Sequence, residues 1–373
     1  MDFSLTEEQR ALADLAAQIL GDRCTLERLK AIEASDDRYD GELWAAFAKA
    51  GLLGAVLPEE VGGSGGGLVE ACLLLEQQGR RVAPLPLLST LVWGAMPLAR
   101  FGSAEQQRRF LPGVASGELL LTAALSESGT DSRAPVATAQ PDGALWKLTG
   151  VKIGVPLAQR AAAVLVPART ADGQTGIFIV EPHAPGVSLA RQDTTNWEAQ
   201  YRMQLSGVAV GRDALLGSLA TGGDILNWIV DRATVGLCAV QAGVCQEAVR
   251  ITAEYASNRK QFDKPIAMFQ AVGQRMADSY IDNEGVNLTM WQAATRLADD
   301  MPAAKEIATA KYWAAEGGSR IGHAALHIHG GISIDVDYPI HRYFLWAKQI
   351  EYTLGAATPQ LAHLGALIAA EPA

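Results

Sequence analysis

The sequence predicts a mainly helical protein with a central β domain, in the chain order helices, strands, helices. Apolar residues at helical spacing fill the first part of the chain, short apolar runs separated by turns follow, and long helical segments return at the end. The 373 residues are 49% hydrophobic and 19% charged, which indicates a large buried core and excludes a disordered chain. We therefore expect an N-terminal helical domain (1–114), a central β domain (115–216) and a C-terminal four-helix bundle (217–373).

The N-terminal segment has helical periodicity and a recognisable helix start. Apolar residues recur at helical spacing from Leu5 to Leu20, and Thr6 is followed three residues later by Gln9, the pattern of a capping box. A glycine-rich run, Gly62-Gly63-Ser64-Gly65-Gly66-Gly67, interrupts the helical pattern. No Lys-Ser or Lys-Thr pair follows it, so we expect a flexible connector here and not a phosphate-binding loop.

The middle and last segments differ in their apolar patterns. Runs at 119–125, 145–151, 161–166 and 177–180 are separated by turn residues with no helix between them, which favours a compact β domain such as a small barrel. After residue 217 the pattern predicts four helices with short connections, the signature of an antiparallel bundle. Their expected ranges are 224–257, 266–298, 303–327 and 340–370.

Composition excludes several classes of protein. With 31 basic and 41 acidic residues the net charge is −10, which argues against a nucleic-acid-binding protein. The four cysteines match no zinc spacing and are too few for a disulfide scaffold. The uncharged run 82–99 contains three prolines, so it does not predict a membrane span, and the N-terminal residues lack a basic signal-peptide region. We expect a cytoplasmic protein.

No metal site or classical nucleophile is expected. His323 and His327 share a helix face near His329, but no carboxylate or thiol lies at ligand spacing beside them, so a structural role is favoured. The stretch from Ser126 to Gly129 lacks the Gly-x-Ser-x-Gly spacing of a nucleophile elbow.

Two segments have residue types suited to binding a phosphate-containing ligand. In the first, Arg259, Lys260 and Lys264 surround Phe262, so a guanidinium for phosphate lies beside an aromatic ring. A basic cap at a helix C-terminus explains this segment equally well. In the second, Gly330-Gly331 follows a helical segment and could let a ligand approach the backbone, although a helix-ending turn is the simpler interpretation.

Taken together and in this order, the segments resemble the acyl-CoA dehydrogenase family. Further matches are Pro58-Glu59-Glu60-Val61-Gly62-Gly63, the run 258–270 with its Arg-x-x-Phe and closing Phe-Gln, and the Asp-Tyr-Pro-Ile-x-Arg stretch after the paired glycines. The resemblance covers essentially the whole chain. It implies FAD bound at a subunit interface and an acyl-CoA thioester as the substrate.

The resemblance also implies roles for individual residues. Arg259 and Gln261 match pyrophosphate or ribityl contacts, Phe262 and Gln270 match the adenosine half, and His327 stands where the family usually has Gln. The glycines that let the cofactor approach the backbone match Gly330 and Gly331. These seven residues are the expected cofactor site, which in this family serves the FAD of the neighbouring subunit.

The family's catalytic carboxylate is missing from the positions that match it. Leu354 stands at the usual place of the base and Ala233 at its alternative place, so no catalytic residue is expected in this chain. Asp231 and Glu351 lie two or three residues away, a rotation of roughly 200° to 300° on a helix. The flavin-facing Trp-Ile-Thr of the family is replaced by Gly154-Val155-Pro156.

These departures resemble the non-catalytic subunit of actinobacterial heterotetrameric acyl-CoA dehydrogenases that act on steroid side chains. That resemblance implies an α2β2 assembly with a homologous catalytic subunit, dehydrogenation of a steroid-derived acyl-CoA, and electron transfer to an electron-transfer flavoprotein. Two alternatives stay open at this point. One is a self-sufficient homomeric dehydrogenase with a displaced base, and the other is a flavin-free protein that binds acyl-CoA.

Overall fold

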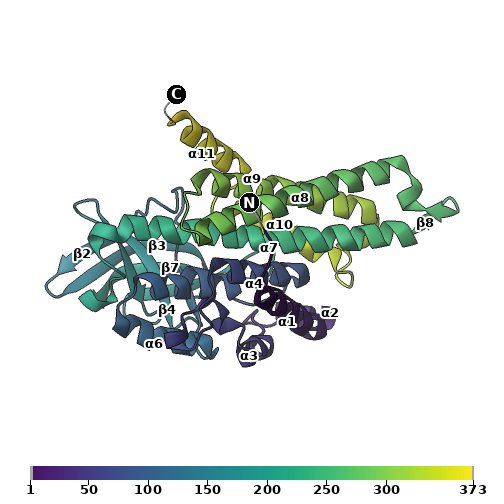
Figure 1. Ribbon diagram of the computed structural model, residues 1–373. Helices are drawn as coiled ribbons and strands as arrows, with labels where there is room; N and C mark the ends of the chain where they lie inside the picture. Colours follow the sequence, from purple (N-terminus) through teal and green to yellow (C-terminus); the bar gives the residue numbers. More distant parts are fainter. Residues whose placement is uncertain (1–2, 372–373) are drawn as a thin grey trace. The chain divides into compact units, whose positions relative to one another are not determined.

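The computed structural model describes residues 3–371, which form two compact units, each of several chain segments. Unit 1 contains residues up to 31, 72–83 and those from 234 onward, and unit 2 contains 32–71 and 84–233. Unit 1 is helical, and unit 2 combines short helices with a β-sheet (Figure 1). The predicted fold class, helices around a central β domain, is confirmed, whereas the predicted domain limits stay a prediction.

The N-terminal helices begin as the sequence indicates. Helix α1 (Glu7–Arg23) has a complete capping box, in which the Gln9 amide donates to Thr6 Oγ1 at 3.2 Å and the Thr6 amide donates to Gln9 Oε1 at 3.0 Å. Further helices before the sheet are α2 (Leu26–Glu33), α3 (Gly41–Lys49), α4 (Leu68–Arg81), α5 (Met96–Phe101) and α6 (Ala104–Ala115), with a π-helix at Leu88–Ala95 and 3-10 turns at Leu53–Val56 and Glu59–Val61.

The glycine-rich run before α4 is an ordered, tightly packed turn, so the prediction of a flexible connector was wrong. The Ser64 amide donates to the Gly54 carbonyl at 3.0 Å, and the Gly66 amide donates to the Ala55 carbonyl at 3.1 Å. A Cβ at Gly63 would lie 2.0 Å from the Leu57 carbonyl oxygen. The glycines are therefore needed because two backbone segments approach each other closely.

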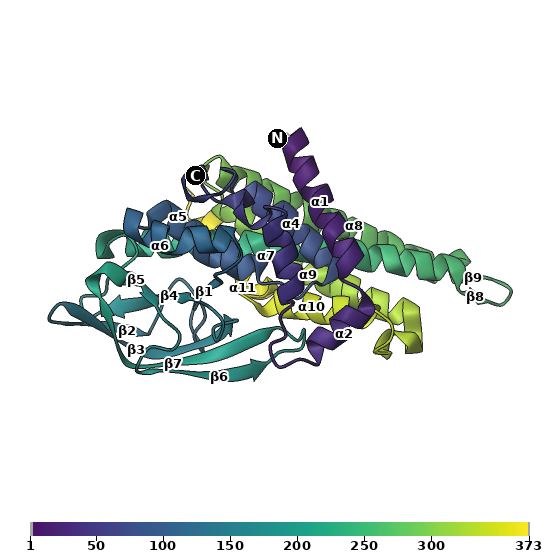
Figure 2. The same ribbon diagram turned by 90° about the horizontal axis from the view of Figure 1, so that it is seen from below.

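The β domain of unit 2 is one seven-stranded, curled sheet (Figure 2). Its path runs β1-β4-β2-β3-β7-β6, and β5 pairs with β4. Register shifts at 148/149 and 152/155 mark bulges in the long β3–β7 pair, and bulges increase local twist. The strands are β1 (Leu121–Ala123), β2 (Thr138–Asp142), β3 (Leu145–Pro156), β4 (Ala163–Thr170), β5 (Thr175–Val180), β6 (Val187–Asp193) and β7 (Ala199–Gly211).

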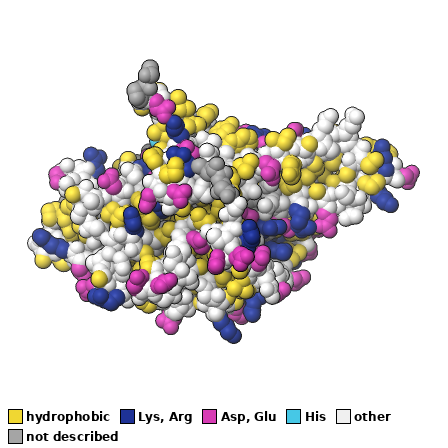
Figure 3. Space-filling model, viewed as in Figure 1, with side chains coloured by type: hydrophobic (Ala, Val, Ile, Leu, Met, Phe, Trp, Pro, Cys, Tyr) yellow, Lys and Arg dark blue, Asp and Glu magenta, His cyan; other side chains and the backbone are white. Residues whose placement is uncertain are grey.

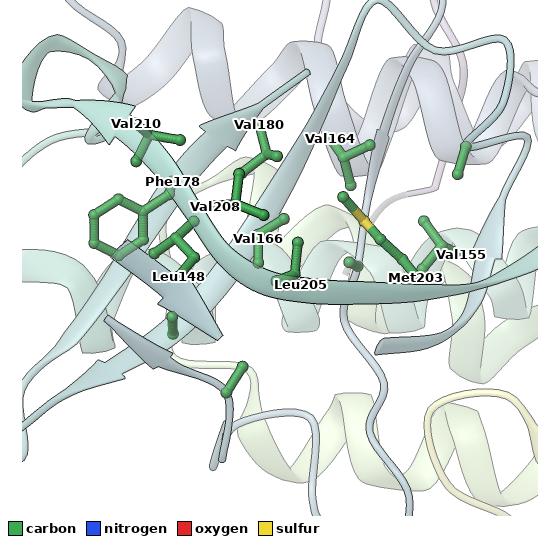
Figure 4. Packing of buried hydrophobic residues seen from close by; sticks show 14 of the residues in the cluster. Leu148, Val155, Val164, Val166, Phe178, Val180, Met203, Leu205, Val208 and Val210 are labelled. Atoms are coloured by element: carbon green, nitrogen blue, oxygen red, sulfur yellow. The ribbon is translucent and has the colours of Figure 1, made fainter. Parts of the chain in front are cut away.

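The core of the sheet is made by alternating side chains of neighbouring strands. Met203 and Leu205 of β7 are fully buried, and Met203 lies between Val155 of the neighbouring β3 and Val164 of β4 (Figure 4). Phe178 of β5 is also fully buried, with its ring centroid 5.7 Å from that of Trp146. A period of two places these side chains on the inner face of the curl, whereas β4 is buried on both faces.

Unit 1 is built on long helices that lie side by side (Figure 1). Helix α4 crosses α7 closely through two glycines, because a Cβ at Gly79 or Gly243 would lie 2.0 Å from a carbonyl oxygen of the other helix. The segment Leu219–Asn258 is long and apolar enough to cross a membrane, but 89% of its most apolar window is buried, as in a core helix of a globular protein. The helices of this part are α7 (Gly222–Asn258), α8 (Gln270–Ala298), α9 (Ala304–His329), α10 (Ile340–Tyr352) and α11 (Ala357–Ala369).

The predicted helix over 340–370 is in fact two helices. The chain turns between α10 and α11, where Leu354 and Gly355 have φ angles of +56° and +99°. The ammonium of Lys311, which is fully buried on α9, donates to the Ile350 carbonyl at 2.7 Å and to the Glu351 carbonyl at 3.1 Å. This buried cation satisfies the last carbonyls of α10, an effect that apolar periodicity cannot predict. The second predicted helix also starts later, at Gln270 after a 3-10 turn at Ile266–Met268.

Candidate cofactor site

The basic segment after α7 forms a β-hairpin whose strands have two residues each. Strand β8 (Lys260–Gln261) pairs with β9 (Lys264–Pro265), and the Ile266 amide donates to the Arg259 carbonyl at 2.8 Å. Phe262 and Asp263 at the tip have φ angles of +51° and +61°, as in a type I′ turn. The hairpin follows directly from the end of α7 (Figure 1).

The hairpin exposes an aromatic ring and basic side chains to solvent. Phe262 is 87% exposed and makes an edge contact with Phe269, and the Lys264 ammonium lies 4.5 Å from the Phe269 ring centroid. Within residues 3–371, no hydrogen bond or ion pair engages the guanidinium of Arg259. Figure 3 shows Lys and Arg side chains at this end of unit 1. The hairpin therefore offers hydrogen-bond donors that an anion could use.

The second predicted segment is an open glycine turn at the end of α9. Gly330 has φ +63° and ψ −138°, a conformation that favours glycine. A Cβ built at Gly330 or at Gly331 meets no atom within 4 Å. The space that these glycines leave is therefore free for a ligand, unlike the space at Gly63, which neighbouring backbone already fills.

Aromatic contacts around His329 hold the hairpin and the glycine turn at the same end of unit 1. The ring of Tyr255, one helical turn before Arg259, stacks on His329 with 4.4 Å between centroids, and its hydroxyl donates to the His329 carbonyl at 3.4 Å. His329 Nδ1 donates to the Ala325 carbonyl at 2.8 Å, and Nε2 accepts from the Tyr338 hydroxyl at 3.1 Å. Burial lowers the pKa of His329, which favours this neutral ring. Tyr338 belongs to the Asp-Tyr-Pro-Ile-x-Arg stretch, whereas no pattern in the sequence pointed to Tyr255.

The other two predicted residues lie on α8 and α9. Gln270 is the first residue of α8 and is exposed, and His327 is exposed two residues before the end of α9. The guanidinium of Arg275 on α8 donates to His327 Nδ1. All seven predicted residues are thus solvent-exposed in unit 1 and are called the exposed group below, and their role toward a cofactor stays a prediction.

The histidines of α9 make separate contacts. His323 lies edge-on to Phe344 with 5.0 Å between ring centroids, His327 contacts Arg275, and His329 is buried against Tyr255. In the described part of the chain, no three His, Cys, Asp or Glu side chains are grouped so as to hold a metal ion.

The carboxylates nearest to the expected base positions are both ion-paired. Asp231 accepts from the Arg133 guanidinium at 2.7 Å in unit 2, and Glu351 accepts from the Lys348 ammonium at 2.6 Å in unit 1. Leu354 has no proton-accepting group, and neither has Ala233, which is fully buried. These ion pairs occupy oxygen lone pairs that a base would use.

A buried ion pair in unit 2 supports the strand that contains Gly154-Val155-Pro156. The Lys152 ammonium contacts the Glu127 carboxylate, and the side chains are 1% and 4% exposed. Glu127 also accepts the backbone N–H groups of Val136 and Ala137, at 2.9 and 3.1 Å. Burial lowers the pKa of Lys152, and the Glu127 charge opposes this shift. The pair ties the loop after β1 to the end of β3.

Comparisons with known proteins agree with this architecture. Residues 6–118 match the model for "Acyl-CoA dehydrogenase, N-terminal domain" and residues 221–368 that for "Acyl-CoA dehydrogenase, C-terminal domain". The acyl-CoA dehydrogenase FadE27 of Mycobacterium tuberculosis is 40% identical over 381 residues, with 100% of both chains covered. The chain belongs to the acyl-CoA dehydrogenase family, whose cofactor is FAD.

Two similar solved structures cover nearly the whole chain. The ChsE4-ChsE5 complex from Mycobacterium tuberculosis contains a chain 41% identical to this one, with a TM-score of 0.95 and 100% of both chains covered. A chain of a variant of the Tcur3481-Tcur3483 steroid ACAD is 47% identical, with a TM-score of 0.91, covering 97% of this chain and 98% of that one.

The exposed group in unit 1 has the chemistry to hold part of FAD. The guanidinium of Arg259 and the amide of Gln261 would donate to phosphate oxygens, and the ring of Phe262 would contact a flat heterocycle. The open space at Gly330 and Gly331 would let the cofactor approach the backbone. The residues therefore fit a dinucleotide.

Proposed function

We propose that this chain is the non-catalytic subunit of a heteromeric FAD-dependent acyl-CoA dehydrogenase in the cytoplasm. It pairs with a homologous catalytic subunit as an α2β2 heterotetramer and completes that subunit's FAD site. The assembly α,β-dehydrogenates the acyl-CoA thioester of a steroid side chain and passes electrons to an electron-transfer flavoprotein.

The observation that carries this proposal is the exposure of all seven cofactor residues on one unit. Arg259, Gln261, Phe262, Gln270, His327, Gly330 and Gly331 are all solvent-exposed in this chain. An accessible guanidinium, an 87% exposed phenylalanine and open glycines lie on one unit, where an incoming FAD held by another subunit would cover them.

The lack of a catalytic base in this chain is consistent with a base supplied by a second subunit. Abstraction of a proton beside a thioester needs a positioned carboxylate, and bound FAD supplies the acceptor for the hydride from the β-carbon. This chain has Leu354 and Ala233 at the matching positions, and its nearby carboxylates are paired with Arg133 and Lys348. The partner subunit would supply the base, and this chain would hold and orient the cofactor.

The comparisons support the partner and the substrate class. One similar structure is named the ChsE4-ChsE5 complex, and the other is named the Tcur3481-Tcur3483 steroid ACAD. Both similarities cover nearly the whole of this chain, so they do not rest on a single shared domain.

The test is purification of this chain alone and co-expressed with a homologous acyl-CoA dehydrogenase chain that retains a glutamate at the base position. We expect a colourless single chain and a yellow complex that bleaches with a steroid acyl-CoA. Arg259→Ala should lower the FAD content of the complex without dissociating it, whereas Arg10→Ala, at another exposed arginine of unit 1, should not. If the single chain is yellow and is bleached by an acyl-CoA, it is a self-sufficient dehydrogenase and the proposal fails.

A further inference from the structure

A contact between two exposed side chains distinguishes the end of α9 from an ordinary helix terminus. Arg275 of α8 places its Nη1 against Nδ1 of His327 on α9, and both side chains are exposed. Long surface side chains lose conformational freedom when they hold one geometry, so an exposed pair of this kind adds little to stability. Within residues 3–371, neither side chain makes a polar contact with any other side chain.

The contact fixes the proton position on the imidazole. A guanidinium carries five N–H donors and no acceptor, so it can only donate to the ring nitrogen that it meets. Nδ1 of His327 must therefore be the acceptor, and the ring hydrogen must lie on Nε2. His329, two residues later, has the opposite arrangement, because its Nδ1 donates to the Ala325 carbonyl and its Nε2 accepts from Tyr338.

His327 is in the last turn of α9, which ends at the open glycine turn. His327 precedes Gly330 by three residues, and Gly330 and Gly331 have no atom within 4 Å of a built Cβ. Imidazole in the other tautomer would present a bare acceptor nitrogen, which would repel the oxygen atoms of a phosphate or a flavin carbonyl. The Nε2–H form is a donor, as is the amide of the glutamine that the family usually has at this position.

We infer that Arg275 is a positioning residue, which holds His327 in the Nε2–H tautomer so that the ring donates a hydrogen bond to an oxygen of the FAD bound by the partner subunit. The inference rests on the proposed function and adds a residue outside the seven. Arg275 does not itself touch the cofactor. It acts by determining which ring nitrogen carries the hydrogen.

The experiment is a double-mutant cycle on FAD binding to the purified complex, with Arg275→Met, His327→Gln and the double variant. The side-chain amide of glutamine always carries N–H donors, whereas histidine carries one on Nε2 only in one tautomer. The effect of Arg275→Met should therefore depend on His327. We expect Arg275→Met to weaken FAD binding about tenfold with His327 present, the loss of one good hydrogen bond, and less than about twofold in the His327→Gln background. Arg10→Met, which removes the same charge from unit 1, should change binding less than about twofold.

A second measurement separates a tautomer effect from a folding defect. Histidine nitrogens of the labelled subunit in the complex, assigned by comparison with His327→Gln, should show a pure Nε2–H ring at His327 and a mixture of the two tautomers in Arg275→Met. An equal loss of FAD in both backgrounds, or an Nδ1–H or doubly protonated ring in the unsubstituted protein, overturns the inference. If Arg259→Ala releases FAD while Arg275→Met has no effect, the inference alone fails; if Arg259→Ala also has no effect, the proposed function fails with it.

Discussion

The buried ion pair in the β domain makes a sharp prediction about stability. Replacing Glu127 with Gln keeps the size of the side chain but removes the charge that faces Lys152. Lys152 is 1% exposed, and Glu127 is its partner. The substitution leaves an ammonium group in a dry interior without a counter-charge. We expect Glu127→Gln to destabilise unit 2 by about 3–5 kcal/mol, the usual cost of removing one member of a buried pair.

The complementary substitution should cost less. In Lys152→Met the remaining Glu127 carboxylate keeps the backbone N–H donors of Val136 and Ala137, at 2.9 and 3.1 Å, so part of its charge stays compensated. A loss of about 1–3 kcal/mol is expected, the cost of a partly unsatisfied buried group. The double variant has no buried charge, and replacement of a whole pair is often neutral. It should therefore be more stable than Glu127→Gln alone.

Urea unfolding of the complex, followed by circular dichroism and tryptophan fluorescence together, measures these differences. At a slope of about 2 kcal/mol/M, a loss of 3–5 kcal/mol lowers the midpoint by about 1.5–2.5 M. The matched control is Asp142→Asn, which breaks the Lys147–Asp142 pair in the same unit; those side chains are 52% and 51% exposed. That change should cost less than about 1 kcal/mol. If Glu127→Gln costs no more than Asp142→Asn, or if adding Lys152→Met recovers no stability, the reasoning is wrong.

Two further predictions concern pH. Burial lowers the pKa of His329 below its ordinary 6.5, so the unfolded chain takes up the proton first as the pH falls. Stability should therefore be lost below about pH 6.5. The urea midpoint, measured from pH 7.5 to 5.5, should fall more steeply in the unsubstituted protein than in His329→Gln. Burial also lowers the pKa of Lys311 to about 8 from 10.5, so the folded state binds fewer protons between these values. Stability should therefore rise by up to roughly 3 kcal/mol across that window, and Lys311→Met should remove the rise.

Much of the fold follows from local sequence patterns. The capping box at Thr6 and Gln9 is present, and the long apolar helix expected at 224–257 is α7, Gly222–Asn258. These two predictions were correct because a cap needs only residues three apart and a helix needs only a repeated apolar face. The order of helical and β segments followed from the change in period from 3.6 to 2, which needs no knowledge of tertiary contacts.

The errors occur where distant residues decide the local backbone. At the break after α10, the ammonium of Lys311, about forty positions earlier, satisfies the carbonyls of Ile350 and Glu351. The glycine-rich run near Gly63 is ordered by backbone contacts to residues 54–57. Neither contact can be recognised from the residues of the segment alone. The segment 340–370 was therefore predicted as one continuous helix, and the glycine-rich run as a flexible connector.

The candidate site shows the same division between local and distant information. The motif residues around Arg259 and Gly330 could be found by their types and spacing, because a phosphate-binding segment needs a guanidinium and a backbone without side chains. The contacts of Tyr255, Tyr338 and Arg275 could not be found in this way. These residues act on the site through stacking and hydrogen bonds to His327 and His329, and such contacts become visible only when α7, α8 and α9 are seen together.

The exposed group of this chain meets the requirements for holding a cofactor, but the chain does not meet those for abstracting a proton. A site that holds a dinucleotide at a subunit boundary needs donors that stay accessible until the partner arrives, and the accessible guanidinium of Arg259 and the open turn at Gly330 meet that need. A site that abstracts a proton needs a dry carboxylate without a cation beside it, and the pairs Arg133–Asp231 and Lys348–Glu351 do not meet that need. Under the proposed function these requirements are met by different subunits, so one chain can keep the first while losing the second.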